Sequence, residues 1–409
     1  MGLVRLLQVS DLHLGKPFGW LPAEKRDERR RDQIAALERS VSQAIERGVH
    51  AIVVPGDLFD AEGVEANTLA SAIGAFEVPG CPPVFIAPGN HDPYSPRSLY
   101  WNARLLKVRD RRWPDHVRLF TGEDWTSYPL PGMDDVRVWG RCFTSNAVSP
   151  ERPLGPDRLR GLPSPDGGRV EIAVFHGSRE GACPPGQTTT APFSDEEVLG
   201  SPFTYLAAGH YHASSGVTAS EGVAAGVRLA YSGSAVALDV TESGQHGALE
   251  VRIEFGRRLP FVETEFVALD LRRAHDLGVD VTHCTSAEQV DRRIEKALDD
   301  AAVAERDLAV VRLSGRLSKD VRYRPAPKLQ ERLFHLRVDP RRLRPDYDLD
   351  VYRDKEPGTT EERFARSLLE RLDQERDPDQ RALVESALYY GLDAFRLHEV
   401  MPVYEEIGE

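Results

Sequence analysis

Apolar runs that stop at polar clusters are the feature that most constrains how this chain can fold. The runs at 3–9, 51–54 and 83–87 end in Asp11-Leu12-His13, Gly56-Asp57 and Gly89-Asn90-His91-Asp92, respectively. Stretches with helical apolar spacing lie between them, at 29–47 and 67–76. Strands that are apolar on both faces and alternate with helices predict a parallel β-α-β-α-β sheet. The polar clusters would then meet at the carboxyl ends of the strands, where ligands bind in such sheets.

Two later clusters repeat this arrangement. His176 ends a strand predicted at 170–175, and Gly209-His210-Tyr211-His212 follows a strand predicted at 203–207. The other elements expected before residue 270 are a helix at 95–112 and strands at 117–120, 136–143, 227–231, 249–255 and 261–269. Alternation in the last three strands predicts an antiparallel second sheet. The expected fold is therefore an α/β (α+β) two-sheet sandwich flanked by helices.

The length of 409 residues exceeds what one ordinary core organises, so several domains are expected. Residues 1–269 would form the first. A helix at 287–304 and strands at 308–313 and 333–338 predict a small α+β domain over 270–345. Residues 346–409 would then comprise a charged connector and two C-terminal helices. Thr359-Thr360-Glu361-Glu362 provides a capping box for the first of these helices.

Composition excludes several classes of protein. No apolar run approaches the roughly 18 residues that a membrane span requires, and no signal peptide is expected, so the predicted location is the cytoplasm. The four cysteines show no Cys-x-x-Cys spacing, which argues against a disulfide framework or a zinc ribbon. The formal net charge of −13 gives no sign of strong unaided binding to nucleic acid.

Seven side chains in the five clusters have the chemistry of metal ligands. They are Asp11, His13, Asp57, Asn90, His176, His210 and His212. Mixed carboxylate, imidazole and amide ligation suits Mn²⁺, Fe or Zn²⁺, and seven ligands are too many for one such ion. Two ions sharing a carboxylate would use them all, with Asp57 as the natural bridge. Such a pair, roughly 3.5–4 Å apart, activates water and clamps a phosphoryl group.

His91 is the remaining group of the third cluster. It would protonate a leaving oxygen or stabilise charge on phosphorus, and Asp92 would orient its imidazole. Taken singly, each cluster is also consistent with an ordinary turn or surface loop. Five of the twelve histidines nevertheless fall in these clusters, each at a predicted strand end, which favours one shared site. The other seven are expected to be surface or structural residues.

The order Asp-x-His, Gly-Asp, Gly-Asn-His-Asp, His and Gly-His-x-His resembles the calcineurin-like metallophosphoesterase superfamily. Three narrower cues resemble the SbcD and YhaO type of DNA-repair exonuclease. They are Ser10-Asp11-Leu12-His13-Leu14-Gly15, Gly56-Asp57-Leu58-Phe59-Asp60 and Tyr231-Ser232-Gly233-Ser234. Protein phosphatases of the superfamily carry Gly-Asn-His-Glu instead, and an Asp-Arg that this chain lacks.

The resemblance implies a metallophosphoesterase domain over 1–269, a capping domain over 270–345 and an ATPase-docking region within 346–409. Asp11, His13, Asp57 and His212 would hold one ion, and Asp57, Asn90, His176 and His210 the other. His91 would be the catalytic histidine. Some relatives have a histidine for DNA handling at the position of Asp60, and an aspartate does not act in the same way.

The activity that the resemblance implies is a two-metal DNA nuclease, expected to use Mn²⁺, in double-strand-break repair or recombination. Its partners would be DNA ends and an SbcC-type coiled-coil ATPase, with a homodimer also considered, and its location would be nucleoid-associated. A phosphodiesterase for small nucleotides and a non-catalytic scaffold for an ATPase remain as alternatives. A basic stretch would contact DNA or form a solvated helix face: Arg97, Arg104, Lys107, Arg109, Arg111 and Arg112.

Overall fold

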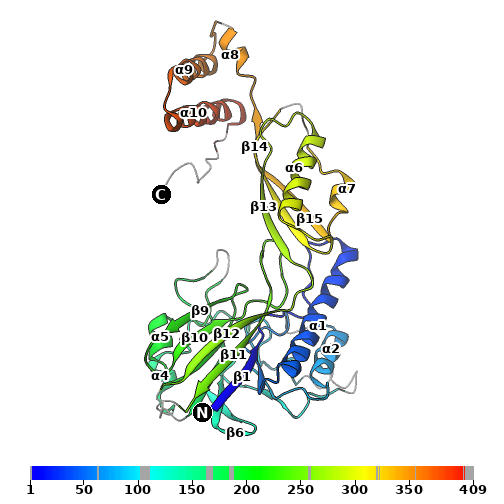
Figure 1. Ribbon diagram of the computed structural model, residues 1–409, viewed down its shortest axis with the longest axis vertical. Coiled ribbons are helices and arrows are strands. Elements are labelled where there is room, and N and C mark those ends of the chain that lie inside the picture. Colours follow the sequence, from blue (N-terminus) through cyan, green and yellow to red (C-terminus); the bar gives the residue numbers. More distant parts are fainter. Residues whose placement is uncertain are drawn as a thin grey trace. The chain divides into compact units, whose positions relative to one another are not determined.

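A computed structural model describes residues 2–61, 64–101, 111–162, 169–183, 188–256, 259–318, 321, 323–354, 356–398 and 400 (Figure 1). The chain divides into two compact units. The first comprises Met1–Val279, Asp291–Leu313 and Pro325–Arg341, and the second comprises Asp280–Val290, Ser314–Arg324 and Arg342–Glu409. The domain boundaries expected near 270 and 345 stay predictions. Within the described residues, no helix is both long enough and apolar enough to cross a bilayer.

The elements alternate between strands and helices in the first third of the chain and are mostly strands in the middle third. The strands are β1 (Gly2–Gln8), β2 (Ala51–Val54), β3 (Val84–Ile86), β4 (Val117–Leu119), β5 (Thr126–Leu130), β6 (Met133–Gly140), β7 (Val170–His176), β8 (Tyr205–Gly209), β9 (Ser215–Ala219), β10 (Ala225–Tyr231), β11 (Gly247–Phe255), β12 (Phe261–Ala268), β13 (Ala274–Asp280), β14 (Leu308–Ser318) and β15 (His335–Asp346). The helices are α1 (Ala23–Glu46), α2 (Ala66–Phe76), α4 (Pro156–Leu159), α5 (Asp195–Gly200), α6 (Ala287–Asp300), α7 (Pro327–Gln330), α8 (Asp350–Asp354), α9 (Thr360–Gln374) and α10 (Pro378–Leu397).

A 12-stranded sheet forms the body of the first unit. Its strand order is β4-β3-β2-β1-β11-β12-β10-β8-β7-β6-β5, with β9 paired to β10. The pairs β1–β2, β2–β3 and β3–β4 are parallel, as the sequence predicts for this part of the chain. The N-terminal strand β1 lies between β2 and the antiparallel β11 (Figure 1).

Buried side chains from the two halves of this sheet share one core. Val53 of β2 and Phe85 of β3 belong to the same apolar cluster as Val138 of β6 and Val174 of β7. Strands so far apart in the sheet order share a core because the sheet folds over itself into two layers. On the outer face, α1 and α2 contribute to a second cluster with the alternate residues of β1 and β2 (Figure 1). The predicted mixed α/β sandwich is confirmed.

Three details differ from the expectations. The strand β10 pairs in parallel with β8 and β12, so the antiparallel second sheet is wrong except for β11–β12. Alternation of polar and apolar residues reports which faces are buried and carries no information on strand direction. The helix α1 begins at Ala23, ahead of the helical stretch expected at 29–47. Of the helix expected at 95–112, residues 95–101 form turns and 102–110 lie outside the described residues.

Beyond residue 270 the observed elements match the expected α+β segment. The strands β13, β14 and β15 form a three-stranded sheet, and α6 follows β13. In the second unit, α9 begins at the predicted capping box, with the Thr359 side chain and the Glu362 backbone N–H joined. Leu369 of α9 and Leu388 of α10 pack in a small core of their own.

Candidate metal centre

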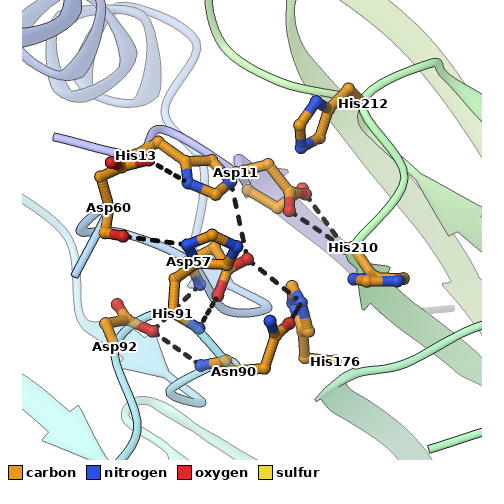
Figure 2. A network of polar contacts seen from close by, with 12 residues as sticks. Asp11, His13, Asp57, Asp60, Asn90, His91, Asp92, His176, His210 and His212 are labelled. Carbon is orange, nitrogen blue, oxygen red and sulfur yellow. Dashed lines mark hydrogen bonds and ion pairs between the residues drawn. The ribbon is translucent and has the colours of Figure 1, made fainter. Parts of the chain in front are cut away.

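The five polar clusters converge at one edge of the sheet. His176 is the last residue of β7, and the remaining clusters follow β1, β2, β3 and β8 directly. Figure 2 shows the seven expected ligands with their side chains directed toward a common centre. All of them apart from Asn90, His210 and His212 are at least nine-tenths buried. The convergence follows from the parallel pairing, which places these strand ends side by side.

The backbone at this edge adopts conformations that ordinary residues avoid. Positive φ angles occur at Asp11 (51°), His13 (46°), Asp57 (50°) and His210 (116°). These account for four of the nine non-glycine residues with positive φ in the described chain, a concentration typical of functional sites. Backbone hydrogen bonds between the strand ends, such as His13 N–H to the Asp57 carbonyl at 2.9 Å, hold the strained turns. The Gln33 amide of α1 donates to the carbonyl of His13 at 2.7 Å.

Two glycines of the motifs are required by close approach. A Cβ at Gly89 would lie 2.2 Å from Asp57 Oδ1, and a Cβ at Gly209 would lie 1.9 Å from the Pro55 carbonyl oxygen. Any side chain at either position would displace a neighbouring strand end. The glycines in Gly-Asn-His-Asp and Gly-His-x-His therefore serve the packing of the site.

Each of the four expected ligand imidazoles is anchored through its outer nitrogen. The contacts are His13 Nδ1 to Asp60 Oδ1 (3.0 Å), His176 Nδ1 to the Pro55 carbonyl (3.0 Å), His210 Nε2 to the Thr188 carbonyl (3.0 Å) and His212 Nδ1 to Glu242 Oε1 (2.8 Å). Metal-binding histidines characteristically donate their second N–H to a carbonyl or carboxylate in this way. In a neutral ring this contact places the proton on the outer nitrogen, so that the inner nitrogen can bind a metal.

The inner nitrogens of His13 and His176 both face the Asp57 carboxylate. His13 Nε2 is buried, has no hydrogen-bond partner and lies 3.5 Å from Asp57 Oδ2. His176 Nε2 lies 3.3 Å from the same carboxylate oxygen and 3.0 Å from Asn90 Oδ1. Without a metal, the protonated His176 ring donates to the Asn90 amide oxygen. Once the ring loses that proton, both atoms are acceptors that a cation can share.

Three overlapping groups of donors have the spacing of ion sites, one of them formed by His13, Asp60 and His91. Asp11, His13 and His212 offer donor atoms within 4.8 Å of one another, as do Asp11, Asp57 and His176. Asp57 Oδ2 contacts imidazoles of these last two groups, which is the position of a bridging ligand. This arrangement fits two divalent ions of the kind that accept mixed carboxylate and imidazole ligands.

Charges within the cluster shift its pKa values strongly. Burial raises the pKa of Asp57, but the facing His176 and His13 outweigh it and lower the pKa below the usual range. Burial lowers the pKa of His176, yet the Asp57 carboxylate raises it to about 9. For His210, burial and the neighbouring His176 charge lower the pKa to about 4. The Asp57 carboxylate is therefore ionised at neutral pH, as a metal ligand must be.

His91 and Asp92 are adjacent in sequence but differ in burial and in hydrogen-bond partners. His91 is exposed, its backbone N–H donates to Asp57 Oδ1 at 3.0 Å, and its Nδ1 lies 2.9 Å from the Asp60 carbonyl oxygen. Asp92 is buried, and its carboxylate accepts from the backbone N–H groups of Asp57, Phe59 and Gly89 and from the Tyr100 hydroxyl. Burial and the Asp57 charge raise the pKa of Asp92.

These contacts correct the expected orientation of His91 by Asp92. The Asp60 carbonyl holds the His91 ring, and Asp92 joins the loops after β2 and β3. A backbone carbonyl has no sequence signature, which is why the adjacent carboxylate was the natural expectation. The catalytic assignments of His91 and Asp92 and the seven metal assignments stay predictions.

Two functional candidates were missed from the sequence. Asp60 orients His13 through its carboxylate and His91 through its carbonyl. Its position in the motif Gly56-Asp57-Leu58-Phe59-Asp60 could have indicated a role at the site. From the sequence, Asp60 is notable only because some relatives have a histidine there. Glu242 orients His212 and also accepts from the Leu238 backbone N–H at 2.8 Å. It lies in a turn between β10 and β11, where no motif marks it.

The expected basic surface is described only in part. Arg111 pairs with Glu77, whereas Arg104, Lys107 and Arg109 lie outside the described residues. Its contact with DNA stays a prediction.

Three solved structures resemble the fold at low sequence identity. A protein of Thermus thermophilus matches with a TM-score of 0.36 and 16% identity, over 65% of this chain and 99% of its own. A dimetal phosphatase from Danio rerio matches with a TM-score of 0.34 and 10% identity, over 65% and 99%. The purple acid phosphatase PPD1 from yellow lupin (Lupinus luteus) seeds matches with a TM-score of 0.37 and 10% identity, over 66% and 53%.

A comparison with curated proteins yields no match. The family model for calcineurin-like phosphoesterases matches residues 4–214, just over half of the chain. That stretch begins in β1 and ends just past His212, so it contains all five clusters that converge in the structure. With its motifs, their order and their meeting point in agreement, the chain belongs to the calcineurin-like phosphoesterase family.

Proposed function

We propose that this phosphoesterase is a two-metal DNA nuclease that acts in double-strand-break repair or recombination with an SbcC-type ATPase. The observation that carries the catalytic part is the set of anchored imidazoles, of which His13, His176 and His212 offer donor atoms close to those of Asp11 or Asp57. The resemblance assigns Asp11, His13, Asp57 and His212 to one ion and Asp57, Asn90, His176 and His210 to the other.

The chemistry follows from how these residues are held. Two divalent ions, proposed to be Mn²⁺, would lower the pKa of a water and neutralise charge on the phosphoryl group. Asp57 lies between the two sets of donors and fixes their separation. His91 is held through Nδ1 by the Asp60 carbonyl, which leaves Nε2 for the substrate. From there it would protonate the leaving oxygen of a phosphodiester.

The DNA substrate is supported by the narrower resemblance. Two of its cues have structural parts at the site. The hydroxyls of Ser10 and Ser232 lie 3.0 Å apart, and the Ser234 N–H donates to the His212 carbonyl at 3.0 Å. These two hydrogen bonds connect the loops that carry Asp11 and His212. The serines of both cues therefore support the positions of two expected ligands. The specificity for DNA itself rests on the resemblance to the SbcD type.

The ATPase partner is proposed to dock on the C-terminal helices. In α10, Leu383, Phe395 and Leu397 are 61%, 38% and 45% exposed. Exposed apolar residues on an otherwise packed helix pair suit a protein surface. Co-purification of the wild-type chain with such an ATPase tests the pairing, and loss of the complex in Leu383→Glu is the expected result. If the Leu383→Glu variant still forms the complex, the ATPase does not dock at this part of α10.

The catalytic proposal is tested on labelled DNA ends with Mn²⁺ or Mg²⁺, beside bis(4-nitrophenyl) phosphate. Wild-type protein should cleave both substrates with Mn²⁺. His91→Ala should keep its metal content and lose about 10²- to 10⁴-fold in rate, because the proton donor is gone and the ligands remain. His283→Ala, which changes an exposed histidine outside the site, is the matched control. Full activity in His91→Ala would remove the catalytic role of that residue.

A phosphodiesterase for small nucleotides is the second candidate. The net charge of −13 favours it, because an acidic protein gains little from a polyanionic strand without a basic partner. Turnover of cyclic or dinucleotide substrates without cleavage of single- or double-stranded DNA would select this alternative.

A further inference from the structure

A pocket of about 260 Å³ lies beside the metal centre and has no assigned part in the reaction. His176 lines it on one side, and Arg141, Phe143, Ser145 and Ser149 line it elsewhere. Gly140, the last residue of β6, pairs in parallel with Val174 of β7. Arg141 therefore follows its strand at the same edge at which His176 ends the next strand.

The Arg141 guanidinium is buried, and its ion pair with Glu151 is long. Its side chain is 9% exposed, and Nη1 is buried with no hydrogen-bond partner. The nearest carboxylate oxygen, of Glu151, lies 3.8 Å from Nη2, and that carboxylate is bound by Arg158. Burial, reinforced by the Arg158 charge, lowers the pKa of Arg141. A guanidinium stays protonated even so, and a buried charge without a partner is costly.

The second carboxylate that lines the pocket, that of Glu123, does not pair with Arg141. The Glu123 carboxylate is exposed to solvent and accepts from the Thr144 hydroxyl. The wall itself is tied to the metal-site loops. Phe143 N–H donates to the Pro88 carbonyl at 3.0 Å, and its ring packs edge-on against His176 at 5.9 Å between centroids. A ligand in the pocket would thus be held at a fixed position relative to His176.

We propose that this pocket binds the nucleotide next to the cleaved bond, with Arg141 donating to the phosphate of that nucleotide. This inference rests on the proposed function and extends it from a single ester to a strand. A strand repeats its phosphates at every nucleotide, so a strand at the metal centre brings a second anion close to His176. The planar guanidinium matches a phosphate with paired N–H donors.

The test combines changes in the protein with changes in the substrate, as in a double-mutant cycle. The substrate is a short single-stranded thymidine oligonucleotide. One phosphate adjacent to the cleaved bond is replaced by a neutral methylphosphonate, on either side in turn. In wild-type protein with Mn²⁺, one of the two replacements should raise KM about tenfold, because a charge-assisted hydrogen bond is lost. In Arg141→Gln the same replacement should raise KM by less than about twofold, since its partner is already absent.

Arg137→Gln is the matched control, because this exposed arginine lies on β6 away from the pocket and should keep the full methylphosphonate penalty. Arg141→Lys retains the charge and should show an intermediate penalty, which serves as the readout if Arg141→Gln does not fold. Equal penalties in wild-type protein and both Arg141 variants would overturn the pocket assignment and leave the nuclease proposal standing. Wild-type hydrolysis of bis(4-nitrophenyl) phosphate without cleavage of any oligonucleotide would overturn both.

Discussion

At the scale of single residues, the site depends on groups that hold the ligands as much as on the ligands. His13 and His212 face the same cluster, and each is fixed by a carboxylate behind it, Asp60 and Glu242 respectively. Because the carboxylate accepts the outer N–H, the ring neither rotates nor changes tautomer. The Asp60 carbonyl extends the same control to His91.

Replacing Glu242 with glutamine should weaken one of the two ion sites. Loss of such an orienting carboxylate typically lowers metal affinity by about 10- to 100-fold, and the affected ion should be the one assigned to His212. Calorimetric titration of metal-free protein with Mn²⁺ measures this directly. Glu196→Gln, on the surface helix α5, should titrate as wild type. Equal affinities in wild type and Glu242→Gln would show that the His212 ring needs no such support.

The sequence predicts the side chains of this site far better than their supports. Polar side chains at the ends of apolar strands form a pattern that can be recognised in the sequence. The seven expected ligands found in this way lie at the same edge of the sheet. The supports at Pro55, Thr188 and the Asp60 main chain are carbonyl groups, which every residue carries. Glu242 is distant in sequence and becomes relevant only when the turn after β10 folds back. Arg141 was missed because an arginine after a strand has no recognised pairing with the clusters.

At the scale of elements, a buried carboxylate joins the central strands to α1. Glu250 of β11 is fully buried and accepts from Arg5 of β1, from Arg47 at the end of α1 and from Arg252. Burial raises the pKa of Glu250, but the three arginines outweigh it and lower the pKa from 4.5 to about 2. The carboxylate therefore stabilises the fold above the pKa of the unfolded chain, and this contribution is lost as the pH falls toward 2.

Glu250→Gln should lower the free energy of unfolding at pH 7 by about 1–2 kcal/mol, because the arginines are partly exposed and solvent screens them. Between pH 4.5 and 2 the variant should lose less stability than wild type. Urea unfolding at several pH values, followed by circular dichroism, measures both effects. Parallel pH profiles for the two proteins would exclude this carboxylate as a source of acid sensitivity.

Elements were predicted well where periodicity was strong. The strands β1, β2, β3 and β7 and the helix α2 occur where the apolar spacing predicts them, and α1 covers its predicted stretch but begins earlier. Pairing direction was not predictable in the second half of the sheet, where β10 is parallel to β8 and β12 and antiparallel to β9. Direction there depends on connections that leave the sheet and return, and local sequence does not encode them.

At the scale of the whole molecule, the first unit includes more than the sandwich. The fully buried Arg29 of α1 pairs with Asp270, just after β12, and Arg272 stacks on the Phe334 ring at 3.7 Å. These contacts attach the segment after residue 270 to the α1 side of the first unit. The sequence predicts a domain boundary near residue 270, because the pattern of strands and helices changes there. Buried ion pairs that cross this point cannot be predicted from the spacing of apolar residues.

This phosphoesterase is proposed to hold two divalent ions on one shared carboxylate, that of Asp57. The most direct measurement is a calorimetric titration of the metal-free, full-length chain with Mn²⁺, repeated on two variants. Wild type should bind two ions per chain, His212→Ala should keep one, and Asp57→Asn should lose high-affinity binding of both, because Asp57 contacts both sets of donors. A single ion in wild type, or two retained in Asp57→Asn, would contradict the account.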